Sequence, residues 1–238
     1  YALEGSIGAP LDDPGIVLLL KGAVLSSDAE LSRDAGGRWY VKGDSTEGAL
    51  LALAAKGGLR PAETRMECPR VEEFPFSSER KRMTTINNMA DGRRFAFLKG
   101  APEVILERCR AIQIGNQSVA LGAGGRAKLL QVNEDMARDA LRVLALAYRE
   151  LPARDDYAEE QVENELVCLG LVGMMDQPRE EACEAVKVCR QVHVKPVMIT
   201  GDHRLTAVAV AKELGIFRDG DRVLTGDELA TMDEETLE

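Results

Sequence analysis

Two hydrophobic runs near the N-terminus have the boundary residues of buried helices. Asp13-Pro14 can open the first, GIVLLLKGAVL, because aspartate caps helices and proline suits their first turn. The second, GDSTEGALLALAAKGGL, can begin at Asp44 or Ser45 and end at Gly57-Gly58. Asp44 and Glu47 have the spacing of a capping box, so the simplest role for Glu47 is that of a helix-capping carboxylate.

A β-hairpin is predicted in the middle of the chain. Arg82–Asn88 and Arg93–Leu98 have strand character and are separated by the turn Ala90-Asp91-Gly92. If this turn is a three-residue loop with its glycine left-handed, Lys81 and Lys99 lie diagonally adjacent on one face of the sheet. A two-residue Asp-Gly turn would instead send the two lysines to opposite faces.

Lysines this close together repel each other, so their pairing suggests an anion between them. Phosphate is the obvious candidate, and the nearby ring of Phe76 would suit a purine base beside its phosphates. The alternative is a solvated edge of the hairpin, where lysines discourage edge-to-edge association.

The rest of the N-terminal region is less clearly marked. Arg38–Val41 is a short candidate strand, and Arg60–Val71, interrupted by two prolines, is a candidate connection or edge strand. Pro102 opens a predicted helix, APEVILERCRAI, and Gly115–Gly125 is turn-rich and predicts a surface loop. Asn133 then caps a longer predicted helix, EDMARDALRVLALAYREL, whose apolar residues recur at helical spacing.

The C-terminal part alternates between strand and helix patterns. LVCLGLVGMMD predicts a buried strand, and after residues 176–179 come a helix (EEACEAVKVCRQV), a strand (KPVMI) and a helix (LTAVAVAKELGI). This alternation is typical of a parallel α/β sheet, whose ligands bind beyond the carboxyl ends of the strands. Thr200, Gly201 and Asp202 lie at such an end, before a helix N-terminus, and predict a phosphate pocket.

The composition predicts a folded, acidic protein. Hydrophobic residues make up 45% of the 238 residues, which is enough for a core, and the formal net charge is −10. This charge argues against a nucleic-acid-binding protein and against a basic membrane-surface helix. Any anion site must therefore gather its cations locally, as the hairpin does.

Cysteine use and hydropathy bear on the compartment. The five cysteines form no Cys-x-x-Cys pair and no metal-ligand spacing with His193 or His203, so we expect no metal site. Their odd number and wide scatter suit a reducing cytosol. Lys21 interrupts the longest apolar run, and neither a bilayer-spanning segment nor a secretory signal peptide is evident. These features predict a soluble cytosolic piece.

Six motifs appear in one order along the chain: GDSTEGAL, FSSERKRM, KGAPE, RVLALA, DQPR and TGDH. Together they resemble the P-type cation-transporting ATPases, in particular the calcium-pump branch, from about Tyr1 to at least Phe217. The resemblance implies an α+β fold with two parts. Residues 1–175 would form a nucleotide-binding domain, an antiparallel sheet flanked by helices. Residues 176–238 would be an incomplete parallel α/β segment of the phosphorylation domain, which is haloacid-dehalogenase-like.

The resemblance also implies roles for individual residues. Phe76 would stack on adenine and Glu47 would face its amino group, while Arg142 would reach the phosphates and Leu144 would border the base. Lys81 and Lys99, the latter followed by Gly100 in KGAPE, would flank the base and the ribose–phosphate region. Thr200, Gly201 and Asp202 would form the phosphoryl pocket. Two departures from the family pattern are Ser45 in the first motif and Gln177 in the hinge, each in place of a proline.

Other motifs of the family do not occur in this sequence. Neither DKTGT, which carries the phosphorylated aspartate, nor TGDGxND and the lysine before it, is present. The chain is therefore expected to bind ATP, with Mg²⁺ accompanying the nucleotide, but not to hydrolyse it. Its partners would be the rest of a membrane pump: the membrane helices, the actuator domain and the remaining phosphorylation domain. The parent would then be an ion-translocating ATPase of the cell membrane, with this part on the cytosolic face.

Two alternatives belong to other classes. A self-contained haloacid-dehalogenase-like phosphatase would need an upstream Asp-x-Asp nucleophile, and none is present. A free-standing nucleotide-binding module is the second alternative, although a start at Tyr1 without methionine favours a piece of a longer protein. An incomplete sheet would expose unpaired edges, so dimerisation through them is also expected.

Overall fold

The computed structural model describes residues 12–139, 141–154, 156–175, 180–201, 204–218 and 220–232. The chain divides into two compact units, Tyr1–Gln131 with Val143–Met174 and Val132–Arg142 with Met175–Glu238. The α+β class expected of the first unit is confirmed.

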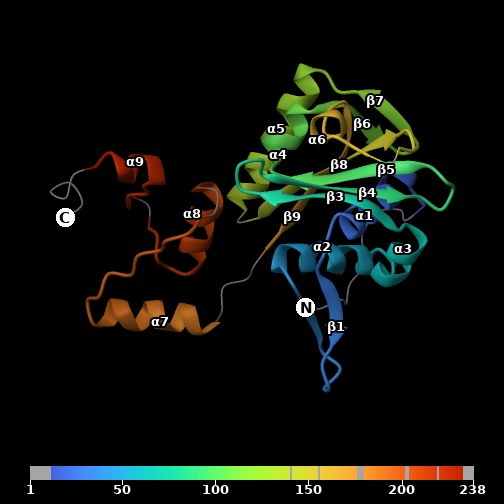
Figure 1. The fold of residues 1–238 in the computed structure, drawn as a ribbon. Coiled ribbons are helices and arrows are strands. Elements are labelled where there is room, and N and C mark those ends of the chain that lie inside the picture. The colour runs from blue at the N-terminus through green and yellow to red at the C-terminus, as the bar shows by residue number, and fades with distance from the viewer. Residues whose placement is uncertain are drawn as a thin grey trace. The chain divides into compact units, whose positions relative to one another are not determined.

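A seven-stranded sheet forms the centre of the first unit (Figure 1). In sheet order the strands are β3 (Arg70–Ser77), β4 (Arg82–Asn88), β5 (Arg94–Gly100), β8 (Arg142–Leu151), β9 (Leu166–Met174), β6 (Cys109–Ile114) and β7 (Gln117–Ala120). Neighbours are antiparallel from β3 through β8 and between β6 and β7, whereas β6 and β9 run parallel. The sheet is therefore mixed, with the parallel pair β6 and β9 in a mainly antiparallel arrangement.

The predicted hairpin is formed by β4 and β5. Asn88 pairs with Arg94, and the Met89 N–H donates to the Arg93 carbonyl at 2.8 Å. The remaining three residues form the loop, in which Gly92 is left-handed at φ +83°. This loop sets Met83 opposite Lys99, so the register of the three-residue turn is confirmed.

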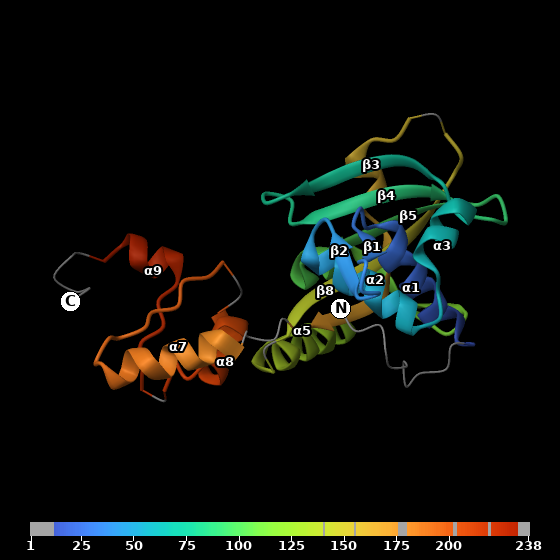
Figure 2. The same ribbon diagram turned by 90° about the horizontal axis from the view of Figure 1, so that it is seen from below.

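Three helices and a small hairpin cover one face of the sheet. They are α1 (Pro14–Leu25), α2 (Ser45–Lys56), α3 (Pro61–Glu67), and the pair β1 (Glu30–Arg33) and β2 (Trp39–Lys42). Figure 2 shows these elements from below the sheet. Leu25 and Leu50 from the helices join Phe95, Phe97 and Leu146 from the strands in one hydrophobic cluster. The predicted N-terminal helices are confirmed, and Asp13 and Asp44 cap them.

The opposite face is covered by α4 (Pro102–Glu107), α5 (Ala123–Arg138) and α6 (Glu159–Val162). Ile105 and Leu106 of α4 pack with Ala96 and Leu98 of β5, which alternate with the phenylalanines of the other face. This alternation lets a single strand contribute to both layers of the core.

Four predictions of secondary structure were wrong in the first unit, the largest of them around β8. The helix expected to run from Asn133 through RVLALAYREL does not form: α5 ends at Arg138 and Arg142–Leu151 is a strand. Because β8 lies in the middle of the sheet and is covered on both faces, its residues from Val143 to Tyr148 are all hydrophobic. Such a run cannot be distinguished from a buried helix by its spacing.

The other three errors concern element boundaries. The stretch expected to be a connection or edge strand contains helix α3, with proline at its first position, and β3 begins only at Arg70. The helix that begins at Pro102 ends at Glu107, and the residues from Cys109 form β6. The expected loop 115–125 contains β7 and the beginning of α5.

In the second unit the described residues form the helices α7 (Glu180–Gln191), α8 (Arg204–Glu213) and α9 (Gly226–Ala230). The two longer predicted helices are confirmed. The predicted strand KPVMI is wrong for the described part of the chain, where it pairs with no other strand and leaves Ile199 94% exposed. A strand requires hydrogen bonds from a neighbour, and the described residues supply none.

Candidate functional site

Strand register brings the predicted site residues of the first unit to one end of the sheet. Ser77 pairs with Arg82, Arg82 with Gly100, and Gly100 with Ala145, so the end of β3, the start of β4, the end of β5 and the start of β8 lie side by side. Five predicted site residues of this unit lie on or next to these segments: Phe76, Lys81, Lys99, Gly100 and Leu144.

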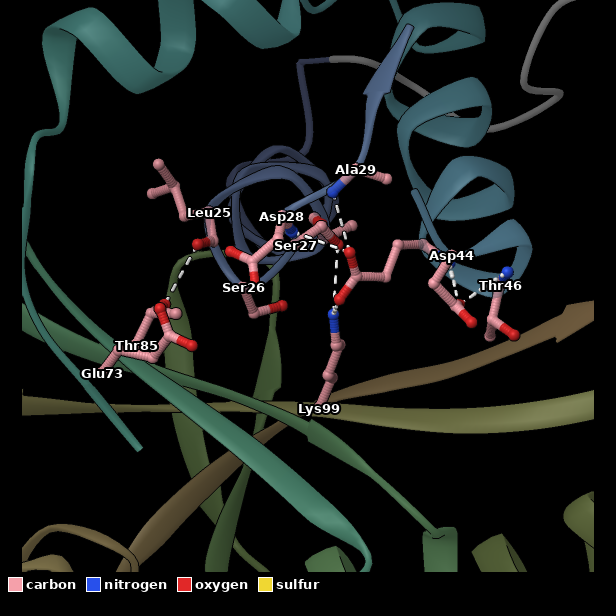
Figure 3. Close-up of polar contacts among 12 residues, drawn as sticks. Leu25, Ser26, Ser27, Asp28, Ala29, Asp44, Thr46, Glu73, Thr85 and Lys99 are labelled. Carbon is pink, nitrogen blue, oxygen red and sulfur yellow. Dashed lines mark hydrogen bonds and ion pairs between the residues drawn. The ribbon is translucent and has the colours of Figure 1, made fainter. Parts of the chain in front are cut away.

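A buried ion pair joins two of the predicted residues. Lys99 is only 7% exposed, and its ammonium contacts Glu47 Oε1 and lies 3.4 Å from Ser27 Oγ. In Figure 3 the Lys99 side chain points from the sheet toward the segment Ser27–Ala29. Burial lowers the pKa of Lys99, an effect that the Glu47 carboxylate only partly offsets.

The second oxygen of the Glu47 carboxylate is held by backbone. Glu47 Oε2 accepts hydrogen bonds from the N–H groups of Asp28, at 2.7 Å, and Ala29, at 2.8 Å (Figure 3). Asp44 alone caps α2, through the N–H groups of Thr46 and Glu47. The interpretation of Glu47 as a capping carboxylate is therefore wrong: its side chain points across to the loop after α1.

Two arginines also donate hydrogen bonds to this loop, mainly to its backbone carbonyl groups. Arg65 donates to the carbonyls of Ser27, at 2.7 Å, and Ala29, at 2.9 Å. Arg70 donates to the Leu25 carbonyl and to Asp28 Oδ1, the latter at 2.6 Å. Sequence reasoning missed both arginines, because their partners lie 36 to 45 residues away and no local motif links them. A cavity of about 180 Å³ opens beside both arginines, and no predicted site residue lines it.

Phe76 presents an aromatic ring to solvent. It is 60% exposed, an unusual state for phenylalanine. Phe76 lies within an irregularity of the β3–β4 pairing, because Phe74 pairs with Thr84 and Ser77 with Arg82, so that three steps along β3 match two along β4.

Lys81 lies in the turn before β4 rather than in the strand. Its backbone is left-handed, with φ +51°, and its side chain is exposed. The Lys81 N–H donates to the Ser77 carbonyl at 2.8 Å, and its carbonyl accepts from the Ala101 N–H at 3.0 Å. These bonds stabilise a conformation that non-glycine residues rarely adopt.

Gly100 has a steric role in this arrangement. A Cβ atom at this position would lie 2.5 Å from the Lys81 carbonyl oxygen and 2.7 Å from the Arg82 Cβ atom. Only glycine allows the Lys81 turn to approach β5 this closely.

The remaining predicted residues are divided between the two units. Leu144 is half-buried and packs against the cluster that contains Phe97 and Leu146. Arg142 opens β8, is exposed and falls in the second unit. Thr200 and Gly201 precede α8 in the second unit, and Asp202 lies outside the described residues.

The site offers binding groups of three kinds: an exposed ring, an exposed ammonium and a carboxylate held in a fixed orientation. In the part of the chain that the structure describes, no three histidine, cysteine, aspartate or glutamate side chains converge as metal ligands would. Nor do the described helices include one with the length and apolar character needed to cross a bilayer.

The chain is similar to known proteins over most of its length. The family model described as "P-type ATPase, cytoplasmic domain N" matches residues 15–181. Calcium-transporting ATPase 1 of Lactococcus lactis is 38% identical over 222 residues, which are 92% of this chain and 24% of that protein. The calcium-transporting ATPase of Bacillus subtilis is 38% identical over 220 residues, with the same coverage of both chains. Cation-transporting ATPase pma1 of Synechocystis is 41% identical over 212 residues, which are 88% of this chain and 23% of that protein. The chain thus spans about a quarter of the length of these relatives.

Proposed function

Because the chain belongs to the family of the P-type ATPase cytoplasmic domain N, we propose that it is the ATP-binding part of a cation-transporting pump. Residues 1–175 are the nucleotide-binding domain in this proposal, and residues 176–238 are part of the phosphorylation domain. The observation that carries it is the exposed ring of Phe76 at the sheet end where Glu47 and Lys99 pair.

Adenine binds in this proposal between the Phe76 ring and the Glu47 carboxylate. A base stacks on an exposed aromatic ring with little loss of side-chain freedom. A carboxylate oxygen can accept about two hydrogen bonds, so Glu47 Oε1, which contacts Lys99, retains capacity for the adenine amino group. Lys99 and the two backbone N–H groups fix the direction in which that oxygen points.

The phosphates would be met by cations at the same sheet end. Lys81 supplies an exposed side chain in the turn before β4, and Arg142 is the first residue of the strand that carries Leu144. Mg²⁺ would be held chiefly by the phosphates, because the described residues gather no carboxylate cluster for it. Bound there, the ion would neutralise phosphate charge.

ATP hydrolysis would require residues that the sequence does not contain. The DKTGT motif is absent, so Thr200, Gly201 and Asp202 would form a phosphoryl pocket without its nucleophile. We therefore propose that the chain binds ATP without turnover. In the parent, which we take to be a membrane-embedded calcium pump like the relatives named for calcium transport, the other domains would complete the cycle.

Calorimetric titration with ATP tests this proposal. Phe76→Ala should weaken ATP binding about tenfold through the lost stacking. Tyr40→Ala is the matched control, because Tyr40 is also an exposed aromatic residue but lies on β2. Lys81→Ala should weaken the binding of ATP and leave that of adenosine unchanged, because only ATP carries phosphates.

Other outcomes favour other functions. Equal ATP affinity in the wild type and in Phe76→Ala would move the nucleotide away from this sheet end. Measurable release of phosphate from ATP would favour the alternative that the chain is a haloacid-dehalogenase-like phosphatase. Saturable binding in a protein whose gene encodes no hydrophobic helices on either side would indicate a free-standing nucleotide-binding module.

A further inference from the structure

A second carboxylate, Glu163, is buried on the face of the sheet opposite Glu47. It follows α6 directly and is only 1% exposed. One of its oxygens accepts from Arg80 Nη1 at 2.9 Å and from the Thr84 hydroxyl, and the other accepts from Arg82 Nε. A buried carboxylate with this many charged partners has a fixed position.

The two arginines extend this fixed position to the turn between β3 and β4. Arg80 also donates to the Pro75 carbonyl, and Arg82 Nη1 donates to the Arg80 carbonyl at 3.1 Å. Residues 75–82 are therefore linked to Glu163 near both ends: at one end through Arg82, and at the other through Arg80, which binds the Pro75 carbonyl. The Arg80 N–H donates to Ser77 Oγ at 3.1 Å, which tightens the middle of the segment.

This tied segment carries Phe76 and Lys81. Pro75, whose carbonyl Arg80 binds, immediately precedes Phe76, and Lys81 lies between the two arginines. The left-handed backbone of Lys81 has a conformational cost, and it persists only where its surroundings leave no alternative. Glu163 with its arginines on one side and the bare Cα of Gly100 on the other provide such surroundings.

We propose that Glu163 is a positioning residue that acts through Arg80 and Arg82 to hold Phe76 and Lys81 in their ligand-binding geometry. The effect of Glu163 on ATP binding rests on the function proposed above, whereas its effect on the conformation of residues 75–82 does not. Glu163 itself contacts no nucleotide, because Arg82 and Thr84, which it binds, face away from Lys99 across the sheet.

The chain contains a matched control for this proposal. Glu159 reaches the same arginines, at 2.8 Å from Arg80 and 3.8 Å from Arg82, but its side chain is 38% exposed. An exposed carboxylate holds its partner weakly, because water competes for both charges. Glu159→Gln and Glu163→Gln thus each remove one charge from the same two arginines, and the two carboxylates differ in burial, in their distance to Arg82 and in the bond from Thr84 to Glu163.

The first experiment is amide hydrogen exchange of the full chain without nucleotide. In Glu163→Gln the exchange of the Lys81 and Ala101 amides should accelerate about tenfold more than that of the core amide of Phe97, whose rate reports any loss of global stability. Glu159→Gln should leave all three at wild-type rates. Exchange at Lys81 and Ala101 that accelerates no more than that of Phe97 in Glu163→Gln would overturn the proposal whatever the protein binds.

The second experiment measures ATP affinity by calorimetry. Glu163→Gln should weaken ATP binding about tenfold, because the ring and the ammonium lose their positions. In the double background Phe76→Ala with Lys81→Ala, the same change should have less than about a twofold effect, because the residues through which Glu163 acts are gone. An equal effect in both backgrounds would reduce Glu163 to a general structural role.

The two proposals fail in different ways. A wild-type chain that does not bind ATP overturns the proposed function, and the exchange rates still decide whether Glu163 holds the turn. If Glu163→Gln does not fold, Arg80→Lys replaces it in both experiments. Lysine keeps the charge but lacks the planar fork that binds the Pro75 carbonyl and Glu163 together.

Discussion

The two faces of the seven-stranded sheet each bury a carboxylate near the same end, and the two carboxylates are neutralised differently. Glu47 pairs with one lysine and two backbone N–H groups. Glu163 pairs with two arginines and a threonine hydroxyl. A lysine can lose its proton when its surroundings change, whereas an arginine remains charged at any pH at which the protein is folded.

This difference matches the positions of the two carboxylates. The Glu47–Lys99 pair can change its charge and hydrogen bonds, which suits the face where a ligand is proposed to arrive. The arginines that bind Glu163 stay charged, so this cluster is suited to holding the neighbouring turn in a fixed position. Two ion pairs of similar burial therefore differ in what they can do.

The largest effect is expected from breaking the cluster around Glu163. Glu163→Ala should lower the free energy of unfolding by about 3–5 kcal/mol, because Arg80 and Arg82 are left largely buried without their main counter-charge. Urea denaturation at neutral pH measures this. Glu159→Ala should cost less than about 1 kcal/mol. Equal losses in the two variants would mean that burial does not distinguish the two carboxylates.

Breaking the Glu47–Lys99 pair should lower the free energy of unfolding by less. Glu47→Gln should lower the free energy of unfolding by about 1–2 kcal/mol, because the amide oxygen can still accept from the Asp28 and Ala29 N–H groups and Lys99 can shed its proton. Glu63→Gln, which removes an exposed partner of Arg60, is the control and should change little. A loss as large as that of Glu163→Ala would contradict the comparison.

The smallest effect concerns pH. Burial lowers the pKa of Lys99 below its ordinary value of 10.5. Between the lowered pKa and 10.5 the unfolded chain binds more protons than the folded chain, so the free energy of unfolding contributed by Lys99 rises with pH across that window. The rise should be about 1 kcal/mol for each pH unit of the window. The difference between wild-type and Lys99→Met unfolding curves measures it, and a difference that falls with rising pH would contradict it.

Sequence alone predicted those parts of the fold that local chemistry determines. The helix from Pro14 follows from an aspartate cap, and the register of β4 and β5 follows from a glycine that can be left-handed at position 92. Strand β8 could not be predicted in this way, because its neighbours in the sheet make it a strand while its own residues fit either pattern.

The candidate site, too, was predicted from the sequence only in part. Motifs identified Phe76, Lys81 and Lys99, but the arrangement around them depends on contacts distant in sequence. Glu47 and Lys99 are 52 residues apart, and Glu163 lies 83 residues from Arg80. No periodicity or spacing joins such pairs, so they become visible only once the chain is folded.

Strand β9 has a consequence for the way this domain is made. It lies between β8 and β6, so the sheet is two separate pieces until Leu166–Met174 is in place. Leu169 and Val172 of this strand also pack with Ala23 and Leu25 of α1, near the other end of the domain. On the ribosome, therefore, nearly the whole domain must be synthesised before its core can close. Until then α1 lacks part of its hydrophobic partner, and β6 and β8 expose open edges to which other nascent chains or chaperones can bind.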